Sequence, residues 1–149
     1  MKEVKGDIWS YDQRKGFIIL ITTNGYLKKD GTGVMGAGVA KQAAERYPEL
    51  PRLLGESLKC RGNVVSLLLG HIASFPVKRV WMEDADLKLI RKSTKRLKMI
   101  AELNPNKKFV TVKAGTGNGR LDWETQVKPI FLRYLKDVDN VFVVSNDGV

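Results

Sequence analysis

The sequence predicts a three-layer α/β/α domain built on a central mixed, largely parallel sheet of about six strands. Two observations lead to this fold class. Strand-like segments alternate along the chain with segments of helical periodicity, and this alternation is typical of a largely parallel sheet. In addition, residues 16–24, with the letters GFIILITTN, form a continuous apolar and β-branched run that indicates a strand covered on both faces.

The other elements of the first half have recognisable composition or ends. Residues 3–11 contain strand-like residues, but their apolar alternation is weak. A helix is predicted over 37–48, which is rich in alanine and stops at a proline. A second helix is predicted over 49–62, where leucines recur at helical spacing and a glycine ends the segment. Residues 63–77 hold one or two strands around Gly70, arranged as a hairpin or a bend.

The second half continues the alternation of helices and strands. Residues 84–104 form an amphipathic helix with an aspartate near its start and Pro105 just beyond its end. A strand is predicted over 107–114, a helix over 121–136 and a closing strand over 140–146.

Length and composition indicate one domain. With 149 residues, of which 43% are hydrophobic and 28% charged, the chain has the size and composition of a single globular domain over residues 1–149. No apolar run approaches the roughly 18 residues that a membrane span needs, and the N-terminus lacks the apolar middle and the cleavage site of a signal peptide. We therefore expect a cytoplasmic monomer with no membrane partner.

The only cysteine and the only histidine do not indicate metal chemistry. A single cysteine, Cys60, forms no internal disulfide, and together with the single histidine, His71, it is too little for a typical zinc site. His71 lies in an apolar predicted strand with no obvious carboxylate partner, so a structural role is expected. Cys60 is expected to be inert because no base accompanies it. We expect neither a bound metal nor a cofactor.

The charge balance favours a polyanionic partner. The chain has 26 Lys and Arg residues against 16 Asp and Glu residues, and its formal net charge is +10. Such a charge attracts nucleic acid and other phosphate-bearing molecules. The alternative is a basic, well-solvated surface, and the lysine-rich part of the third helix, residues 88–98, is interpreted in that way.

The first glycine-rich loop has the spacing of a dinucleotide-binding motif but not its context. Gly31, Gly33 and Gly36 match G-x-G-x-x-G. In a dinucleotide site the first glycine immediately follows a strand, and an acidic residue ends the next strand. Here seven residues separate Asn24 from Thr32, and the next predicted strand offers no carboxylate. A nicotinamide-dinucleotide site is therefore not predicted.

A phosphate site remains the favoured interpretation of this loop. Glycines let backbone N–H groups approach an anion, and a helix that begins near Gly36 adds a favourable partial charge. A second loop over 114–123 is also glycine-rich, follows a predicted strand and leads into a helix. Each loop alone could be a tight strand-to-helix turn. Together, at the carboxyl edge of a parallel sheet, they predict a nucleotide diphosphate held from both sides.

The chain resembles the macrodomains, the ADP-ribose-binding fold. The matching segments, in family order, are GDIW at 6–9, ITTN at 21–24, GVMGAGVAKQAAERYP at 33–48, SFPVKRVW at 74–81 and GTGNGRLDW at 115–123. Residues 25–32 stand out as extra length in the first loop. The combination of VMGAGVA with RLDW is similar to the branch that contains the DNA ADP-ribosyl glycohydrolase antitoxins and the terminal ADP-ribose hydrolase of animals.

The resemblance implies a role for each matching residue. Asp7 would accept a hydrogen bond from the adenine amino group beside the Ile8 amide, although a turn aspartate is the alternative. Asn24 would contact the distal ribose, although it could equally cap the end of its strand. The loops implied to enclose the diphosphate and distal ribose consist of Gly33, Val34, Met35, Gly36, Ala37 and Gly38 on one side and of Gly115, Thr116, Gly117, Asn118 and Gly119 on the other.

Lys78 is the catalytic residue that the resemblance implies, beside the distal ribose. Without the resemblance, a lysine after a strand is more often a surface charge. Cleavage of a glycosidic bond there needs a neutral amine that attacks the anomeric carbon or a cation that stabilises developing charge. A neutral amine requires a lowered pKa, to which desolvation and the neighbouring Arg79 could contribute. The sequence leaves both mechanisms open.

Two positions of the second loop define its chemistry further. Gly119 stands where the animal hydrolase has a catalytic aspartate, and the antitoxin group also has glycine there. Asp122 is expected to cap the following helix rather than to take part in chemistry.

Trp81 and Trp123 could stack on bases, but packing in the core or at a rim is the simpler expectation.

The resulting prediction is an enzyme, an ADP-ribosyl hydrolase of the macrodomain type. Its expected partners are ADP-ribose and, because of the basic charge, ADP-ribosylated DNA. Two alternatives stay open. One is a phosphatase that acts on ADP-ribose 1''-phosphate, and the other is a module that binds ADP-ribose without turnover.

Overall fold

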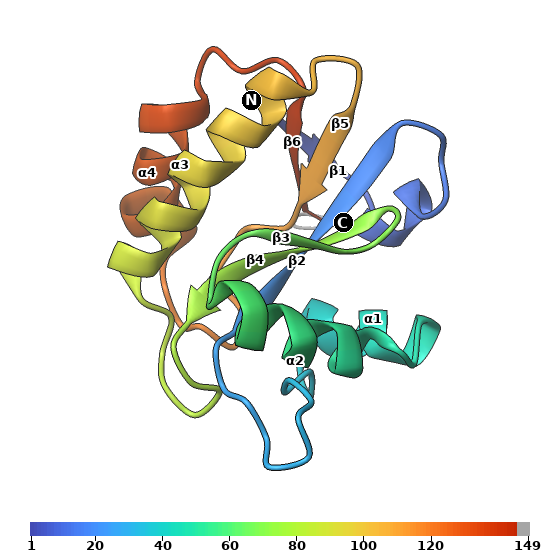
Figure 1. Ribbon diagram of the computed structural model, residues 1–149. Helices are drawn as coiled ribbons and strands as arrows, with labels where there is room; N and C mark the ends of the chain where they lie inside the picture. The colour runs from blue at the N-terminus through green and yellow to red at the C-terminus, as the bar shows by residue number, and fades with distance from the viewer. Residues whose placement is uncertain (146–149) are drawn as a thin grey trace.

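A mixed six-stranded sheet organises the computed structural model of the chain, which describes residues 1–145 (Figure 1). The strands are β1 (Lys2–Lys5), β2 (Phe17–Asn24), β3 (Ser66–Leu69), β4 (Ile72–Lys78), β5 (Lys108–Thr111) and β6 (Val141–Ser145). Their order is β1-β6-β5-β2-β4-β3, and every neighbouring pair is parallel except β3 with β4. The predicted mixed, largely parallel sheet is confirmed. Asn146, the last residue of the predicted closing strand, lies outside the described residues.

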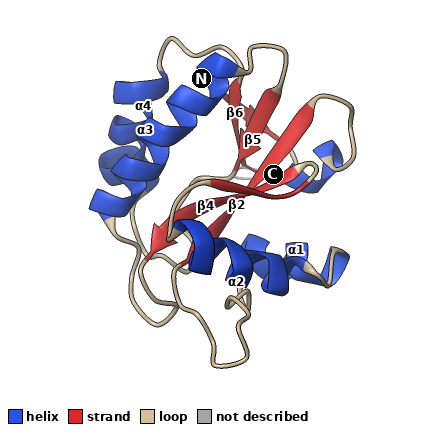
Figure 2. Ribbon diagram, in the orientation of Figure 1, coloured by secondary structure: helices blue, strands red, loops and turns tan. Residues whose placement is uncertain are grey.

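Helices cover both faces of this sheet, which gives three layers (Figure 2). The α-helices are α1 (Gly38–Arg46), α2 (Leu50–Arg61), α3 (Leu87–Leu103) and α4 (Lys128–Leu135). Helices α1 and α2 pack on one face, and α3 and α4 pack on the other. Two short segments complete the fold, the 3₁₀-helix η1 (Ile8–Tyr11) and the π-helix η2 (Trp123–Val127). Within residues 1–145, no helix is both long enough and apolar enough to span a membrane.

Strand β2 is covered on both faces, as its apolar run predicts. Side chains alternate across a strand. Ile19 and Ile21 accordingly belong to the apolar cluster beside α1 and α2, whereas Leu20 belongs to the cluster beside α3 and α4. These three side chains are at most 1% exposed. Their burial anchors the strand whose carboxyl end leads into the first glycine-rich loop.

The predicted helix ends follow from local chemistry. The Asp86 carboxylate accepts hydrogen bonds from the backbone N–H groups of Lys88 and Leu89, at 2.9 and 3.4 Å, and so caps α3. Gly62 ends α2 with a φ of +82°, a conformation that favours glycine.

The segment predicted as one helix over 121–136 is divided into η2 and α4. Asp122 caps it as expected, because its carboxylate accepts a 2.8 Å hydrogen bond from the Thr125 N–H group. The wider hydrogen-bond spacing of η2 changes to the α-helical spacing where Pro129 occurs near the start of α4. Proline has no N–H group to continue the backbone ladder, so a change of spacing at this point leaves fewer unsatisfied groups.

A charged contact joins β1 to this helical segment. The Glu3 carboxylate lies 2.8 Å from the Lys128 ammonium and accepts a 2.9 Å hydrogen bond from the indole N–H group of Trp123. The hydrogen bond from Lys128 is the main cause that lowers the pKa of Glu3. Trp123 itself is buried and packs edge-on against Phe131. Of the two tryptophans considered in the sequence, Trp123 therefore belongs to the core.

This contact predicts a pH-dependent contribution to stability. A carboxyl group whose pKa is lowered by folding stabilises the protein above its unfolded-state pKa, and this contribution is lost as the pH falls. We expect Glu3→Gln to lower the free energy of unfolding by about 0.5 kcal/mol at pH 7, because the pair is partly exposed. Below about pH 4.3 the difference should shrink. Urea titrations of both proteins at pH 7 and pH 3.5 test this, and an equal difference at both pH values would contradict it.

Candidate active site

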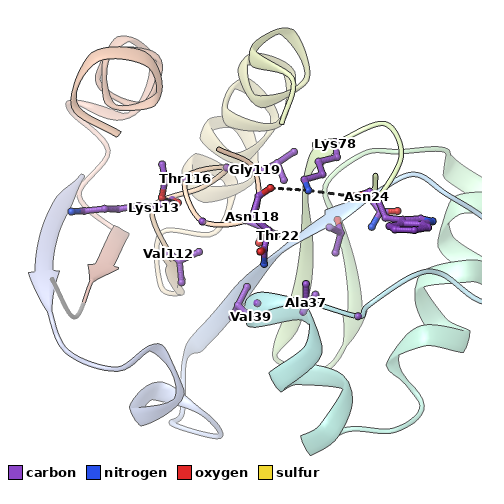
Figure 3. A pocket seen from close by; sticks show the side chains of 18 of the residues that line it. Thr22, Asn24, Ala37, Val39, Lys78, Val112, Lys113, Thr116, Asn118 and Gly119 are labelled. Atoms are coloured by element: carbon purple, nitrogen blue, oxygen red, sulfur yellow. Dashed lines mark hydrogen bonds between the residues drawn. The ribbon is translucent and has the colours of Figure 1, made fainter. Parts of the chain in front are cut away.

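A cleft lies at the edge of the sheet where the parallel strands end (Figure 3). Its volume is about 1030 Å³, and the loops that follow β1, β2, β4 and β5 line it. Parallel strands place their carboxyl ends at one edge, which is where ligands bind in α/β proteins. The volume suits a ligand at the upper end of the usual size range for binding pockets.

The first glycine-rich loop presents backbone amides to this cleft. Helix α1 has no side-chain cap at Ala37, so its first N–H groups have no intrahelical or capping acceptor. Gly38 begins the helix with a φ of +57°, and Gly36 is exposed, with no atom within 4 Å of the position that a Cβ would occupy. Free N–H groups at a helix N-terminus form a site for an anion.

The second glycine-rich loop faces the first across the cleft. A Cβ on Gly38 would lie 3.3 Å from the side-chain nitrogen of Asn118, so the two loops approach each other closely. A Cβ on Gly119 would lie 2.3 Å from the carbonyl oxygen of Gly115 and 2.8 Å from the Cβ of Ala85. An aspartate at position 119 therefore has no room in this loop. The glycine seen in the sequence is a steric requirement of the loop's conformation.

Most of the sequence-predicted site residues line the cleft. They are Asp7, Ile8, Asn24, Val34, Gly36, Ala37, Gly38, Lys78, Gly115, Thr116, Gly117, Asn118 and Gly119.

Gly33 and Met35 lie elsewhere. Residues 33–36 alternate between the core and the cleft, and these two face the core. Leu54 fills the space beside Gly33, where a Cβ would lie 2.6 Å from a leucine methyl group, and Met35 is 8% exposed within the core. Gly33 forms an isolated bridge with Leu27, and alternate residues of this stretch are buried and more exposed, as in a strand, where successive residues point in opposite directions.

Asp7 stands at one end of the cleft and caps η1. Its carboxylate accepts a 3.0 Å hydrogen bond from the Trp9 N–H group, which is the structural role weighed in the sequence. Asp7 itself is exposed, and a carboxylate has further lone pairs that can accept from a ligand. The indole N–H group of Trp9 donates to Gln42 at 2.7 Å, which fixes this corner against α1.

Asn24 and Lys78 are neighbours at the other end. They are register partners across β2 and β4, immediately after a β-bulge. The Asn24 amide donates to the Val34 carbonyl at 3.2 Å and accepts from the Tyr26 N–H group at 3.0 Å. A primary amide has two N–H groups and two acceptor positions, so one of each remains for a ligand. Asn24 therefore orders the first loop and still lines the cleft.

The Lys78 ammonium is held at the junction of two loops (Figure 3). It donates to the carbonyl oxygen of Asn118 at 3.1 Å and to that of Trp81 at 3.4 Å. An ammonium has three N–H groups, so these contacts leave one for a ligand. Arg79, which the sequence considers as a second cation, pairs instead with Glu83 at 3.1 Å and with Asp86 at 3.9 Å. Its positive charge is thereby balanced by two carboxylates.

A polar support for Lys78 was not predicted from the sequence. The Asn63 side chain and the Gly25 backbone N–H group donate to the Lys78 carbonyl oxygen, at 3.0 and 3.1 Å. The side-chain Oδ1 atom of Asn63 and the hydroxyl oxygen of Thr23 are buried with no hydrogen-bond partner among the described residues. Asn63 precedes β3 and belongs to no motif, so no local signal could have indicated this role.

The expectation that His71 has no carboxylate partner is wrong. His71 lies in the turn between β3 and β4, and its imidazole Nε2 is 2.7 Å from the Asp12 carboxylate and 3.2 Å from the Tyr47 hydroxyl. Burial raises the pKa of Tyr47. None of the three lines the cleft, so this cluster is separate from the candidate site. Within residues 1–145, no group of three His, Cys, Asp or Glu residues could hold a metal ion.

Solved structures with this architecture define the class of fold. The chain superposes on the macrodomain of Mycobacterium tuberculosis DarG with a TM-score of 0.73 and 24% identity, over 97% of each chain. The macrodomain of Thermus aquaticus DarG gives a TM-score of 0.73 and 23% identity, over 96% of this chain and 95% of that one. The structure of Thermosipho africanus DarTG in complex with ADP-ribose gives a TM-score of 0.74 and 20% identity, over 97% of this chain and 42% of that one. The chain is therefore a macrodomain by fold.

Two curated proteins are also similar to the chain in sequence. Over 130 residues the chain is 35% identical to the DNA ADP-ribosyl glycohydrolases of Mycobacterium bovis BCG and Mycobacterium tuberculosis. The alignment covers 78% of this chain and 36% of each relative, so the chain spans about a third of the length of the curated proteins that it matches. No family model matches the sequence.

The crowding at Gly119 predicts a specific loss of stability. Gly119→Ala should lower the free energy of unfolding by about 1–3 kcal/mol, because its Cβ would collide with backbone that cannot move aside without reshaping the loop. Gly117→Ala is the matched control, since no atom lies within 4 Å of its Cβ position. Urea unfolding of both variants measures the difference. Equal stabilities would contradict the inference that position 119 is sterically restricted.

Proposed function

We propose that this macrodomain is an ADP-ribosyl hydrolase that removes ADP-ribose from a modified macromolecule, preferentially ADP-ribosylated DNA. The observation that carries the proposal is the position of the Lys78 ammonium at the end of a cleft enclosed by two amide-rich loops. The curated relatives, with 35% identity over the aligned region, are named for the same activity. A related fold, that of Thermosipho africanus DarTG, is described in complex with ADP-ribose.

ADP-ribose matches the distribution of polar groups along the cleft. The adenine would lie beside Asp7 and Ile8, where a carboxylate and a backbone amide can recognise its amino edge. The diphosphate would lie between the N-terminus of α1 and residues 115–119, where backbone N–H groups and the helix dipole favour negative charge. This order leaves the distal ribose beside Asn24 and Lys78.

The reaction breaks the bond between the anomeric carbon of the distal ribose and the modified base. The oxygen of water ends on that carbon, and the base receives a proton. Lys78 would support this either by attacking the carbon as a neutral amine, with water releasing the sugar afterwards, or by stabilising charge as a cation. Its hydrogen bonds to Asn118 and Trp81 hold the amine in a defined position in either case.

A nucleic-acid substrate is supported by charge. The formal net charge of +10 raises the local concentration of polyanions and favours DNA over an acidic protein segment. ADP-ribosylated DNA, RNA and protein, incubated with the enzyme in parallel, test this preference. The proposal requires the fastest release from DNA, and faster release from protein would contradict it.

Lys78→Ala separates catalysis from binding. We expect ADP-ribose release from ADP-ribosylated DNA to fall at least roughly 100-fold, since the main charged group at the reacting carbon is removed. Calorimetry should show that free ADP-ribose still binds with an affinity within about fivefold of the parent, because the diphosphate is held by backbone amides. Lys92→Ala, an exposed lysine on α3, is the control with the same change of charge.

Further measurements separate the mechanisms and the alternatives. Lys78→Arg keeps the positive charge but does not supply a lysine nucleophile, so retained activity indicates electrostatic stabilisation and lost activity indicates attack by the amine.

A parent protein that binds ADP-ribose but releases none from any substrate would be a binding module. Faster phosphate release from ADP-ribose 1''-phosphate than ADP-ribose release from DNA would make it a phosphatase.

A further inference from the structure

Exposed aromatic and apolar side chains gather on the rim of the cleft at its Lys78 end. Trp81 is 50% exposed, Met82 61% and Tyr26 39%, and all three line the cleft. The backbone carbonyl of Trp81 is one of the two acceptors of the Lys78 ammonium, so the tryptophan directly adjoins the proposed reaction centre. Of the outcomes considered from the sequence, Trp81 lies at the rim and not in the core. Large aromatic surfaces left open beside a ligand cleft are typical of recognition sites.

The two rim aromatics come from loops that touch each other. Gly25, next to Tyr26, donates its N–H group to the carbonyl oxygens of Lys78 and Arg79 at 3.1 and 3.0 Å. A Cβ on Gly25 would lie 3.0 Å from the Arg79 oxygen, so glycine permits this close approach. The loop over residues 25–32 and the loop that follows β4 both project beyond the carboxyl edge of the sheet (Figure 1).

The extra loop is held in shape by its own hydrogen bonds. Leu27 and Gly33 form an isolated antiparallel bridge, and the N–H group of Lys28 donates to the Thr32 carbonyl at 2.9 Å. The Asp30 carboxylate accepts from both the N–H group and the hydroxyl of Thr32, at 3.0 and 2.7 Å. A surface that is ordered before binding loses less conformational entropy when a ligand binds.

Positive charge accompanies the aromatic surface on the side of this loop. Lys28 lines the cleft and Lys29 is exposed beside it, and neither forms a salt bridge within residues 1–145. Lys59 of α2 reaches the same loop, since its ammonium lies 2.7 Å from the position that a Cβ on Gly31 would occupy.

The other side of the rim is less favourable for an anion. It carries Glu83 and Asp84, whose charges are balanced by Arg79 at 3.1 Å and by Arg120 at 3.9 Å. A polyanionic chain would therefore be attracted toward the lysines of residues 25–32 and not toward these carboxylates.

We infer that Tyr26 and Trp81 form a nucleobase-stacking site for the base that carries ADP-ribose in single-stranded DNA, with Lys28 and Lys29 contacting its phosphates. The inference rests on the proposed function, which places the distal ribose at Lys78 and hence the attached base at the rim. Every base has an aromatic face, so stacking selects for a nucleobase over a protein side chain without reading the sequence. The base must be unpaired to be reached, which favours a single strand.

The test compares binding of an ADP-ribosylated single-stranded oligonucleotide with binding of free ADP-ribose, both in the Lys78→Ala background to prevent turnover. Fluorescence anisotropy should show that Trp81→Ala weakens oligonucleotide binding by about 5- to 50-fold and Tyr26→Ala by about fivefold. Each of these variants should bind free ADP-ribose, which has no base on its distal ribose, with an affinity within about twofold of that of the Lys78→Ala protein. Trp81→Phe should restore most of the affinity because a stacking face remains.

Matched controls isolate the rim. Met99→Ala removes an apolar side chain that is 58% exposed on α3 and does not line the cleft, so it should change neither affinity. A double variant, Lys28→Ala with Lys29→Ala, should bind the oligonucleotide more weakly than the background protein, and its affinity should fall less steeply as the salt concentration rises. The reason is that about two fewer phosphate contacts release counterions on binding.

Several outcomes would overturn the inference. Equal weakening of free ADP-ribose by Trp81→Ala would place the tryptophan in the ADP-ribose site itself. An unchanged oligonucleotide affinity, or an equal loss for an ADP-ribosylated peptide, would exclude base stacking. The proposed function fails separately: if the parent releases no ADP-ribose but Trp81-dependent oligonucleotide binding persists, the stacking site stands without the enzyme. If the parent is active and Trp81 has no effect on oligonucleotide binding, the enzyme stands without the stacking site.

Discussion

The parallel pairing of β2 with both β4 and β5 is the constraint on which the cleft depends. Because the three strands run in the same direction, the loops that follow them leave the sheet at one edge. The first glycine-rich loop, the Lys78 end of β4 and the second glycine-rich loop are thereby brought together from positions far apart in the sequence. The buried side chains of β2, which contact helices on both faces, keep this strand in place and with it the geometry of the site.

Backbone groups, more than side chains, shape the part of the cleft assigned to the diphosphate. The unsatisfied N–H groups at the start of α1 need an acceptor from outside the helix. The absence of a side chain at Gly36 leaves its backbone open to a ligand, and that at Gly38 lets the two glycine-rich loops approach each other, whereas Gly119 permits the close folding of its own loop. Such dipoles are already oriented in the free protein, so binding an anion requires little rearrangement.

The loop that follows β4 contributes both to the position of the Lys78 ammonium and to the exposed rim, so in the proposed function it would link catalysis to recognition of the substrate. The loop after β4 supplies the Trp81 carbonyl that holds Lys78 and the Trp81 ring that faces solvent. Its far end is joined to the second glycine-rich loop, since the Ala85 N–H group donates to the Gly119 carbonyl at 2.9 Å. A base that stacks on the rim would therefore contact the same segment that positions the amine. In the proposed function, this arrangement places the bond to be cleaved between a fixed sugar and a fixed base.

Local signals in the sequence determined the elements and much of the candidate site. The apolar run of β2, the glycine that ends α2 and the aspartates that cap α3 and η2 act through neighbouring residues, so the linear sequence reveals them. Most of the residues that the family resemblance selected line the cleft. Tertiary structure alone decided contacts between distant residues, such as that of Lys78 with Asn118 forty positions away and that of His71 with Asp12 fifty-nine positions away. It also turned Gly33 and Met35 into the core and Trp81 outward, because the direction of a loop side chain depends on what packs against the loop from the rest of the fold.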